Sequence, residues 1–168
     1  MKFFIMTSLL FLTFFPFLRV QNEFPDLSKK CREKIESRDS QYNNEVIMEI
    51  ITSFQLESRI KNSYRVTLRD LEVAHQIYGN NPEDSYYQSL AKHFLVSSKG
   101  EPHLFIHANS AILLYKNPSD KNVMIELRLK DRKWIELERK EIQGEKIPFK
   151  VLKCEKEYHN KRLEYEKS

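Results

Sequence analysis

Two histidines, His103 and His107, have the side chains and the spacing that could hold a metal ion. They flank Leu104-Phe105-Ile106 and precede a run rich in β-forming residues, so we place them on a strand. Residues four apart on a strand are separated by about 13 Å, which is too far for one metal ion to bind both. The remaining histidines, His75, His93 and His159, show no better spacing. We therefore predict no metal site and no cofactor.

The carboxylates that could serve in acid–base chemistry are Glu126, Glu136 and Glu138. They alternate with apolar residues on predicted strands, which directs them toward solvent, whereas a general acid or base needs a desolvated pocket. We expect exposed ion pairs instead. The sequence contains no Gly-x-Ser-x-Gly motif, and its three glycines form no phosphate-binding loop. No residue is predicted to be catalytic.

Aromatic side chains are the more suggestive feature. Five of them could line a cleft between a sheet and its helices, where a small apolar ligand would bind: Tyr86, Tyr87, Phe94, Phe105 and Tyr115. An ordinary hydrophobic core is the alternative for the same residues. A carboxylate or histidine in a pocket beside Tyr86 or Tyr87 would favour an enzyme, and a closed apolar core would favour a binding module.

The sequence holds two cysteines, Cys31 and Cys154. In an oxidising compartment such a pair predicts one disulfide, which would close a loop of 122 intervening residues. In the chain-entropy model this loop stabilises the fold by up to about 5 kcal/mol. A catalytic thiol is the rival interpretation, but a nucleophilic cysteine should be paired with a base rather than with another cysteine.

The chain begins with Lys2 and an apolar block of sixteen residues, Phe3–Leu18. This block is short for a membrane span, which needs about 20 apolar residues, and it suits a signal peptide. We expect a signal peptide over 1–20, an α+β domain over 26–156, a charged tail over 157–168 and an extracellular location. An uncleaved anchor is the alternative, because more basic residues follow the block than precede it.

The charge balance bears on the partners. The chain has 28 basic and 24 acidic residues, and removal of the first twenty takes away Lys2 and Arg19, which lowers the net charge from +4 to +2. The two signs are interleaved, whereas nucleic-acid binders concentrate lysine and arginine on one face. We expect an unknown extracellular protein or a small apolar ligand as partner, no nucleic acid, and no membrane span after signal cleavage.

The clearest structural signal is a meander of antiparallel strands, expected over 103–115, 122–130, 134–143 and 147–155. In its second strand one face is apolar and predicted to be buried, while the other is predicted to be solvated: Val123, Ile125, Leu127 and Leu129 against Met124, Glu126, Arg128 and Lys130. A three-residue loop over 131–133 would bring Leu127 opposite Leu137 in the core. A two-residue loop would bring Leu127 opposite Glu136 and mix the faces.

Helices are expected before the meander. A short polar helix is predicted over 26–35 and a loop over 39–44, whereas 45–61 fits a strand or a helix. Its helical stripe consists of Ile47, Ile50, Ile51, Phe54 and Ser58.

A brief strand is expected at Tyr64–Leu68, and the spacing Thr67-x-x-Asp70 resembles a helix start. That helix would end at Gly79. Asn80–Asp84 would begin another helix, which runs from Pro82 to Ser98.

The residues Asn122–Ile142, NVMIELRLKDRKWIELERKEI, resemble the late hairpin of nuclear-transport-factor-2-like (SnoaL-like) domains. The resemblance implies a cone-shaped roll, with helices inside a bent antiparallel sheet and 45–61 as its long first helix. Family members include enzymes and non-catalytic binding modules, and no residue here matches a catalytic motif of the family. The cystatin roll is a second analogue, but its Gln-x-Val-x-Gly loop is missing.

Together these features predict one α+β domain after a signal peptide, with helices packed on a curved antiparallel meander in a cone-shaped roll. The expected function is a secreted, non-catalytic module that binds a protein or a small apolar ligand. An isomerase- or dehydratase-like enzyme with an acid or base in the roll cavity is the alternative. A structural or adhesive protein would require a large exposed apolar patch on the sheet.

Overall fold

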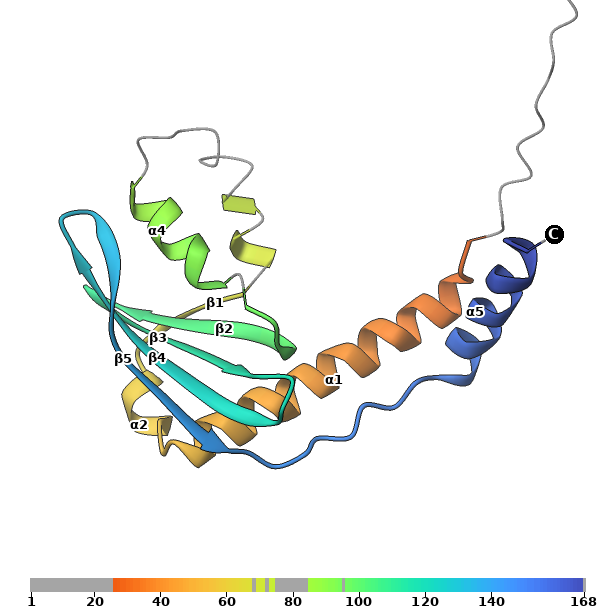
Figure 1. Cartoon of the computed structure of the whole chain (residues 1–168), viewed down its shortest axis with the longest axis horizontal. Helices are drawn as coiled ribbons and strands as arrows, with labels where there is room; N and C mark the ends of the chain where they lie inside the picture. The colour runs from red at the N-terminus through yellow and green to blue at the C-terminus, as the bar shows by residue number, and fades with distance from the viewer. Residues whose placement is uncertain (1–25, 68, 72, 75–84, 95, 168) are drawn as a thin grey trace, which may run out of the picture.

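The computed structural model describes residues 26–167 apart from 68, 72, 75–84 and 95. Five strands form one open antiparallel sheet in the order β1-β2-β3-β4-β5 (Figure 1). The strands are β1 Tyr64–Val66, β2 Lys99–His107, β3 Ser110–Lys116, β4 Lys121–Lys130 and β5 Lys133–Gln143. The helices are α1 Lys29–Ser53, α2 Glu57–Ile60, α4 Ser85–Phe94 and α5 Lys153–Tyr165. The predicted α+β class is confirmed.

The first helix, α1, is one uninterrupted helix of 25 residues. It begins after Ser28, whose hydroxyl accepts a hydrogen bond from the Cys31 N–H at 3.3 Å. The loop predicted over 39–44 is wrong. That stretch contains no glycine or proline, and Gln41 donates to Glu45 one turn later at 2.8 Å, so the helix continues through it.

The undecided segment 45–61 is helical up to Ser53 and again in α2. Of the two alternatives, the helical pattern is the one that matches the packing, because Ile47, Ile50 and Ile51 are all buried against the sheet. Gln55 then adopts a positive φ of 55°, and this turn ends the long helix before it covers the whole sheet.

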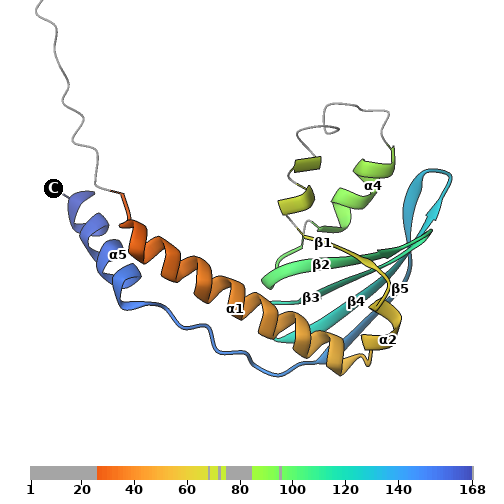
Figure 2. The same cartoon turned by 180° about the vertical axis from the view of Figure 1, so that it is seen from behind.

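Helices cover both faces of the sheet (Figure 2). On one face, which we call the α1 face, apolar residues of α1 pack on Phe105, Leu114 and Met124. On the opposite, α4 face, Tyr87, Leu90 and Phe94 of α4 pack on strand residues that include Leu104, Leu113, Val123, Ile125, Leu127 and Trp134. Met124 was predicted to lie on the solvated face of β4. This prediction is wrong, because Met124 is only 3% exposed.

Two of the predicted strands are wrong. The stretch 103–115 forms β2 and β3, because a tight turn at Ala108, with φ 51°, and Asn109 folds it back on itself. The expected strand 147–155 is also absent. The Gly144 N–H binds the Asp120 carbonyl at 3.0 Å, and the chain then leaves the sheet and runs along α1 to α5 (Figure 1).

The β4–β5 hairpin has a two-residue loop, so the predicted three-residue loop is wrong. Asp131 and Arg132 both have positive φ, 50° and 60°, as a type I′ turn requires. Leu127 is therefore paired with Glu136, and a bulge follows at once, beyond which Glu126 is paired with Glu138 and Ile125 with Arg139. The extra residue of the bulge is Leu137, which is 53% exposed although we expected it in the core.

This turn yields a stability prediction. A left-handed backbone is costly for any residue with a Cβ atom, and Asp-Gly is the preferred pair in a type I′ turn. We therefore expect Arg132→Gly to raise the free energy of unfolding by about 1 kcal/mol in urea denaturation. Arg132→Ala keeps the Cβ atom and should give no such gain. An equal gain from both variants would contradict the backbone explanation.

The amino-terminal half of α1 extends beyond the sheet, and α5 lies beside it (Figure 2). The predicted disulfide is confirmed: Cys31 and Cys154 are joined with an S–S distance of 2.03 Å. Residues 157–165, expected as part of a charged tail, belong to α5 and are mostly solvent-exposed. Within the described part of the chain no helix is both long and apolar enough to cross a bilayer.

The elements predicted between residues 64 and 98 lie only partly within the described residues. Strand β1 is confirmed at Tyr64–Val66, and the Thr67–Asp70 helix start is confirmed by a bond from the Thr67 N–H to the Asp70 carboxylate at 2.7 Å. Helix α4 falls within the helix predicted over 82–98. The proposed signal peptide, the Gly79 stop and the Asn80–Asp84 start lie outside the described residues.

Candidate functional site

The five aromatic residues proposed to line a cleft are divided between the two faces of the sheet. Tyr87, Phe94 and Tyr115 pack together in the core on the α4 face. Tyr86 is 37% exposed and packs edge-on against Trp134 with ring centroids 5.7 Å apart. Phe105 points to the α1 face, so the sheet separates it from the others.

His103 is 1% exposed and lies beside Arg65, whose Nε is 3.1 Å from the His103 Nδ1 atom. Burial, and after it the neighbouring positive charge, lowers the pKa of His103 to about 4. His107 is exposed at the end of β2 and contacts the Asn62 carbonyl at 3.2 Å. Among the described residues no three side chains of histidine, cysteine, aspartate or glutamate gather as a metal site would require.

The three strand carboxylates form ion pairs, as predicted. The pairs are Glu126 with Arg59 at 2.9 Å, Glu136 with Arg139 at 3.0 Å and Glu138 with Lys140 at 3.0 Å. Arg139 also donates to the Tyr115 hydroxyl at 3.1 Å. Each carboxylate keeps at least a quarter of its side chain exposed, so these pairs remain in contact with water.

The strongest polar cluster is a buried network formed by Glu49, Lys116 and Asn122. The Lys116 ammonium, which is 0% exposed, lies 2.8 Å from the Glu49 carboxylate and donates to the Asn122 side chain at 2.6 Å and to the Glu145 carbonyl at 2.9 Å. Asn122 in turn donates to Glu49 at 2.9 Å. Burial would raise the pKa of Glu49, but hydrogen bonds from Lys116, Glu145 and Asn122 outweigh it and lower the pKa below its ordinary value.

This network joins α1, β3 and β4 to the segment that leaves the sheet. A Cβ atom on Gly144 would overlap both Lys116 Nζ and Asn122 Oδ1, so the backbone at Gly144 packs directly over the lysine. The lysine is thus enclosed by its partners and has no space for a substrate. Sequence reasoning missed the network because Lys116 fell in the connection between the predicted strands 103–115 and 122–130.

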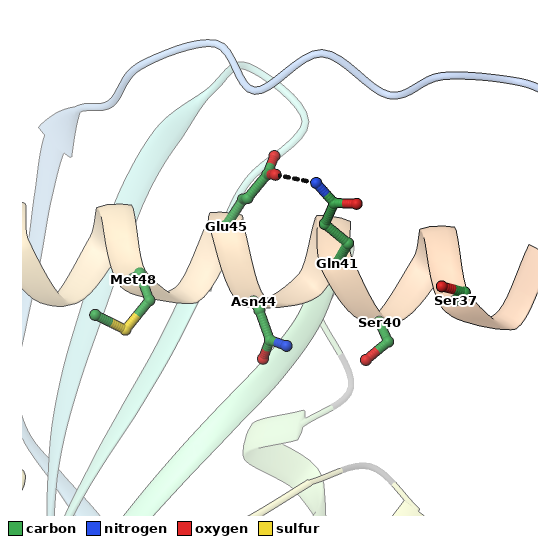
Figure 3. Close-up of a pocket in the computed structure, with 6 residues that line it drawn as sticks. All are labelled: Ser37, Ser40, Gln41, Asn44, Glu45 and Met48. Carbon is green, nitrogen blue, oxygen red and sulfur yellow. Dashed lines mark hydrogen bonds between the residues drawn. The ribbon is translucent and has the colours of Figure 1, made fainter.

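A shallow hollow lies on the outer surface of α1 (Figure 3). Its walls are side chains of this one helix: Ser37, Ser40, Gln41, Asn44, Glu45 and Met48. They project from the helix toward solvent, and Gln41 binds Glu45 rather than a group across the hollow (Figure 3). A strip on one helix offers no opposing wall, so we do not assign a site to it.

A better-formed groove lies on the α1 face at the end of the sheet, where α1 has already turned into α2. It encloses about 310 Å³, and every strand from β2 to β5 contributes to it. Apolar side chains include Phe105, Ile112 and Leu137. Polar and charged side chains include Arg59, His107, Ser110, Glu126 and Arg128. The end of α1 and the bulge in β5 together create this groove.

The chemistry of the groove is that of binding. Ser110 donates its hydroxyl hydrogen to the His107 backbone carbonyl at 2.9 Å, and His107 contacts the Asn62 carbonyl, so the two side chains do not form a nucleophile–base pair. Glu126 is neutralised by Arg59. Exposed apolar surface at Leu137 and the positive charge of Arg128 remain available to a ligand.

No protein-family model matches this chain, and no curated protein or solved structure is significantly similar to it. The case for a function therefore depends on the geometry and chemistry of the groove. Sequence reasoning missed the groove because Leu137 was assigned to the core. No local sequence signal marked it, because Asp131-Arg132 lacks the glycine that is typical of a two-residue type I′ turn.

Proposed function

We propose that this protein is a secreted, non-catalytic α+β module that binds another protein through the groove at the end of its α1 face. The observation that carries the proposal is the exposure of Leu137, 53%, and Ile135, 39%, beside this groove. Polar and charged side chains surround these apolar residues. An apolar centre within a polar rim is typical of protein-binding surfaces.

The dimensions of the groove favour a protein over a small apolar ligand. Pockets for small molecules enclose about 300–1,000 Å³ and cover most of the ligand surface. This groove, at about 310 Å³, is at the lower end of that range and is open to solvent. The aromatic residues that could have lined a ligand cleft, such as Tyr87, Phe94 and Tyr115, are already packed against one another in the core.

The arrangement of the ionisable groups favours binding over catalysis. His103 is enclosed beside Arg65, Glu49 is held by Lys116, and Glu126 is paired with Arg59. Neither Tyr86 nor Tyr87 lines the groove. We therefore do not carry the isomerase- or dehydratase-like alternative further.

Export of the chain, with removal of residues 1–20, is part of the proposal. Its support is the disulfide between Cys31 and Cys154, since such bonds persist in oxidising compartments. The cone-shaped roll of the nuclear-transport-factor-2-like domains is the fold that we propose. Its support is the order of elements, in which the long helix α1 and the shorter α4 precede the strands β2 to β5.

Replacement of Leu137 tests the binding function. We expect Leu137→Asp to weaken capture of a partner from the medium of cells that secrete the protein by at least roughly tenfold, because a charge would enter the apolar centre of the contact. Quantitative mass spectrometry after cross-linking measures the captured partner. The stability should change little, since Leu137 is exposed.

The matched control is Leu163→Asp on α5. Leu163 is 52% exposed and lies outside the groove, so this variant should retain the partner. Equal capture by both variants would show that the groove is not the binding site. Recovery of the protein from cells with residues 1–20 still attached would contradict export with signal removal.

A further inference from the structure

The β4–β5 hairpin carries an unbalanced positive charge next to the groove. Residues 128–133 read Arg-Leu-Lys-Asp-Arg-Lys, with four basic side chains and one acidic, although the whole chain has 28 basic and 24 acidic residues. We call Arg128, Lys130, Arg132 and Lys133 the basic tip. Arg128, Lys130 and Lys133 are exposed.

Neighbouring charges on the same sheet are neutralised, but three of the tip charges are not. Glu126, Glu136 and Glu138 each have a basic partner, and Lys121 pairs with Glu141 at 3.8 Å. Within the described residues no carboxylate lies within ion-pair distance of Arg128, Lys130 or Lys133. Their charge is available to an external group.

The tip also departs from what hairpin stability favours. Lys130 and Lys133 are paired directly across the two strands, and like charges in that position repel each other. Arg132 occupies a left-handed backbone position that glycine would occupy at lower cost. Departures of this kind tend to occur at functional positions, where a partner compensates for them.

The basic tip and the groove share one face of the sheet. Alternation along β4 places Lys130 on the same side as Arg128, which lines the groove, and Ile135 is paired with Arg128 on the adjacent strand. Leu137 follows in the bulge. The surface therefore runs from two exposed apolar side chains to a cluster of positive charge.

We propose that the segment docked on this surface is an acidic stretch of a partner protein, whose apolar side chains cover Ile135 and Leu137 while its carboxylates pair with Arg128, Lys130 and Lys133. This proposal rests on the proposed function and specifies the chemistry of the partner. A purely apolar occupant would leave three cations without partners at the rim. An acidic occupant neutralises them and relieves the Lys130–Lys133 repulsion.

The test uses the full disulfide-bonded chain and a short fluorescein-labelled peptide in which glutamates flank a leucine pair. Fluorescence anisotropy should show binding that weakens as salt is added, and a peptide with lysines in place of the glutamates should not bind. Lys130→Glu should reduce the affinity for the acidic peptide at least tenfold. The same variant should raise the midpoint of urea unfolding, because it places opposite charges across the turn.

Lys156→Glu on α5 is the control, since it changes the net charge equally and leaves the tip intact. Equal loss of peptide binding in both variants, or binding of the lysine peptide, would overturn the proposal. So would salt-sensitive binding to phosphatidylserine vesicles without binding to the acidic peptide, which would assign the tip to a membrane surface.

The two proposals can fail separately. If Leu137→Asp abolishes capture of the cellular partner while Lys130→Glu leaves it unchanged, the groove binds a protein but the acidic segment is wrong. If neither variant affects capture, both the proposed function and this inference are wrong. Loss of capture in both variants, with the acidic peptide bound, supports both.

Discussion

Replacement of Lys116 by methionine is expected to lower the free energy of unfolding by about 3–5 kcal/mol, the range typical when one partner of a buried ion pair is removed. Lys116 is fully buried, and its ammonium contacts Glu49, Asn122 and the Glu145 carbonyl. Methionine fills the space but leaves the Glu49 carboxylate without its cation. Urea denaturation at neutral pH measures the loss.

The control is an ion pair of similar length at the surface. Lys99 lies 2.7 Å from Asp120, with a third of its side chain exposed. Lys99→Met should therefore cost at most about 1 kcal/mol. If Lys116→Met lowered the free energy of unfolding no more than Lys99→Met does, the buried network would not be a major source of stability.

A double replacement separates the loss of the pair from the loss of packing. In Lys116→Met with Glu49→Leu, no charge is left buried, so most of the stability should return. Asn122 would keep its other hydrogen bond, in which its side-chain amide donates to the Ser53 hydroxyl at 2.9 Å. A double variant as unstable as Lys116→Met alone would show that shape, rather than charge, limits this site.

The pH dependence of the Lys116→Met variant follows from the pKa of Glu49. Because the folded state lowers this pKa, the contribution of Glu49 to stability is complete above the unfolded value, near 4.5, and is lost as the pH falls through the folded value. Lys116→Met removes the main group that stabilises the carboxylate. The stability difference between wild type and variant should therefore be largest near neutral pH and shrink below about pH 4.5.

Much of the fold could be predicted because local pattern and tertiary packing agree. The alternation of Val123, Ile125 and Leu127 in β4 corresponds to burial on the α4 face. The stripe of Ile47, Ile50 and Ile51 corresponds to the packing of α1. In each case the apolar side chains that the periodicity places on one face are all buried in the same core.

The candidate site could not be predicted because it depends on where regular patterns stop. Leu137 continues the apolar alternation of β5, and only the two-residue turn with its bulge brings it to the surface. The end of α1 at Ser53 leaves the groove uncovered, and no glycine or proline marks that end. The buried role of Lys116 depends on Glu49, which is 67 residues away along the chain.

The second large effect concerns the disulfide. We expect Cys31→Ser with Cys154→Ser to lower the free energy of unfolding by about 2–5 kcal/mol, as is typical for the loss of a native disulfide. The bond joins two helical segments that otherwise bury little against each other. Between Cys31 and Val46 no residue of α1 is fully buried, and α5 contributes no buried residue at all.

Apart from the disulfide, the polar contacts between these segments centre on Arg38, whose side chain is 11% exposed. Arg38 binds the Lys150 carbonyl at 2.7 Å and Glu155 at 3.1 Å, and it lies over the Phe149 ring. These contacts depend on a single side chain, and α5 has no buried residue of its own. We therefore expect α5 to detach in the double serine variant while the sheet stays folded.

Hydrogen exchange distinguishes this local effect from general destabilisation. The amides of α5 and of the first turns of α1 should lose nearly all protection, whereas those of β3 and β4 should keep protection that reflects the lower global stability. Cys31→Ser alone should behave in the same way, since either change removes the bond. If α5 stays protected after the loss of both cysteines, its side-chain contacts with α1 are sufficient to hold it in place without the disulfide.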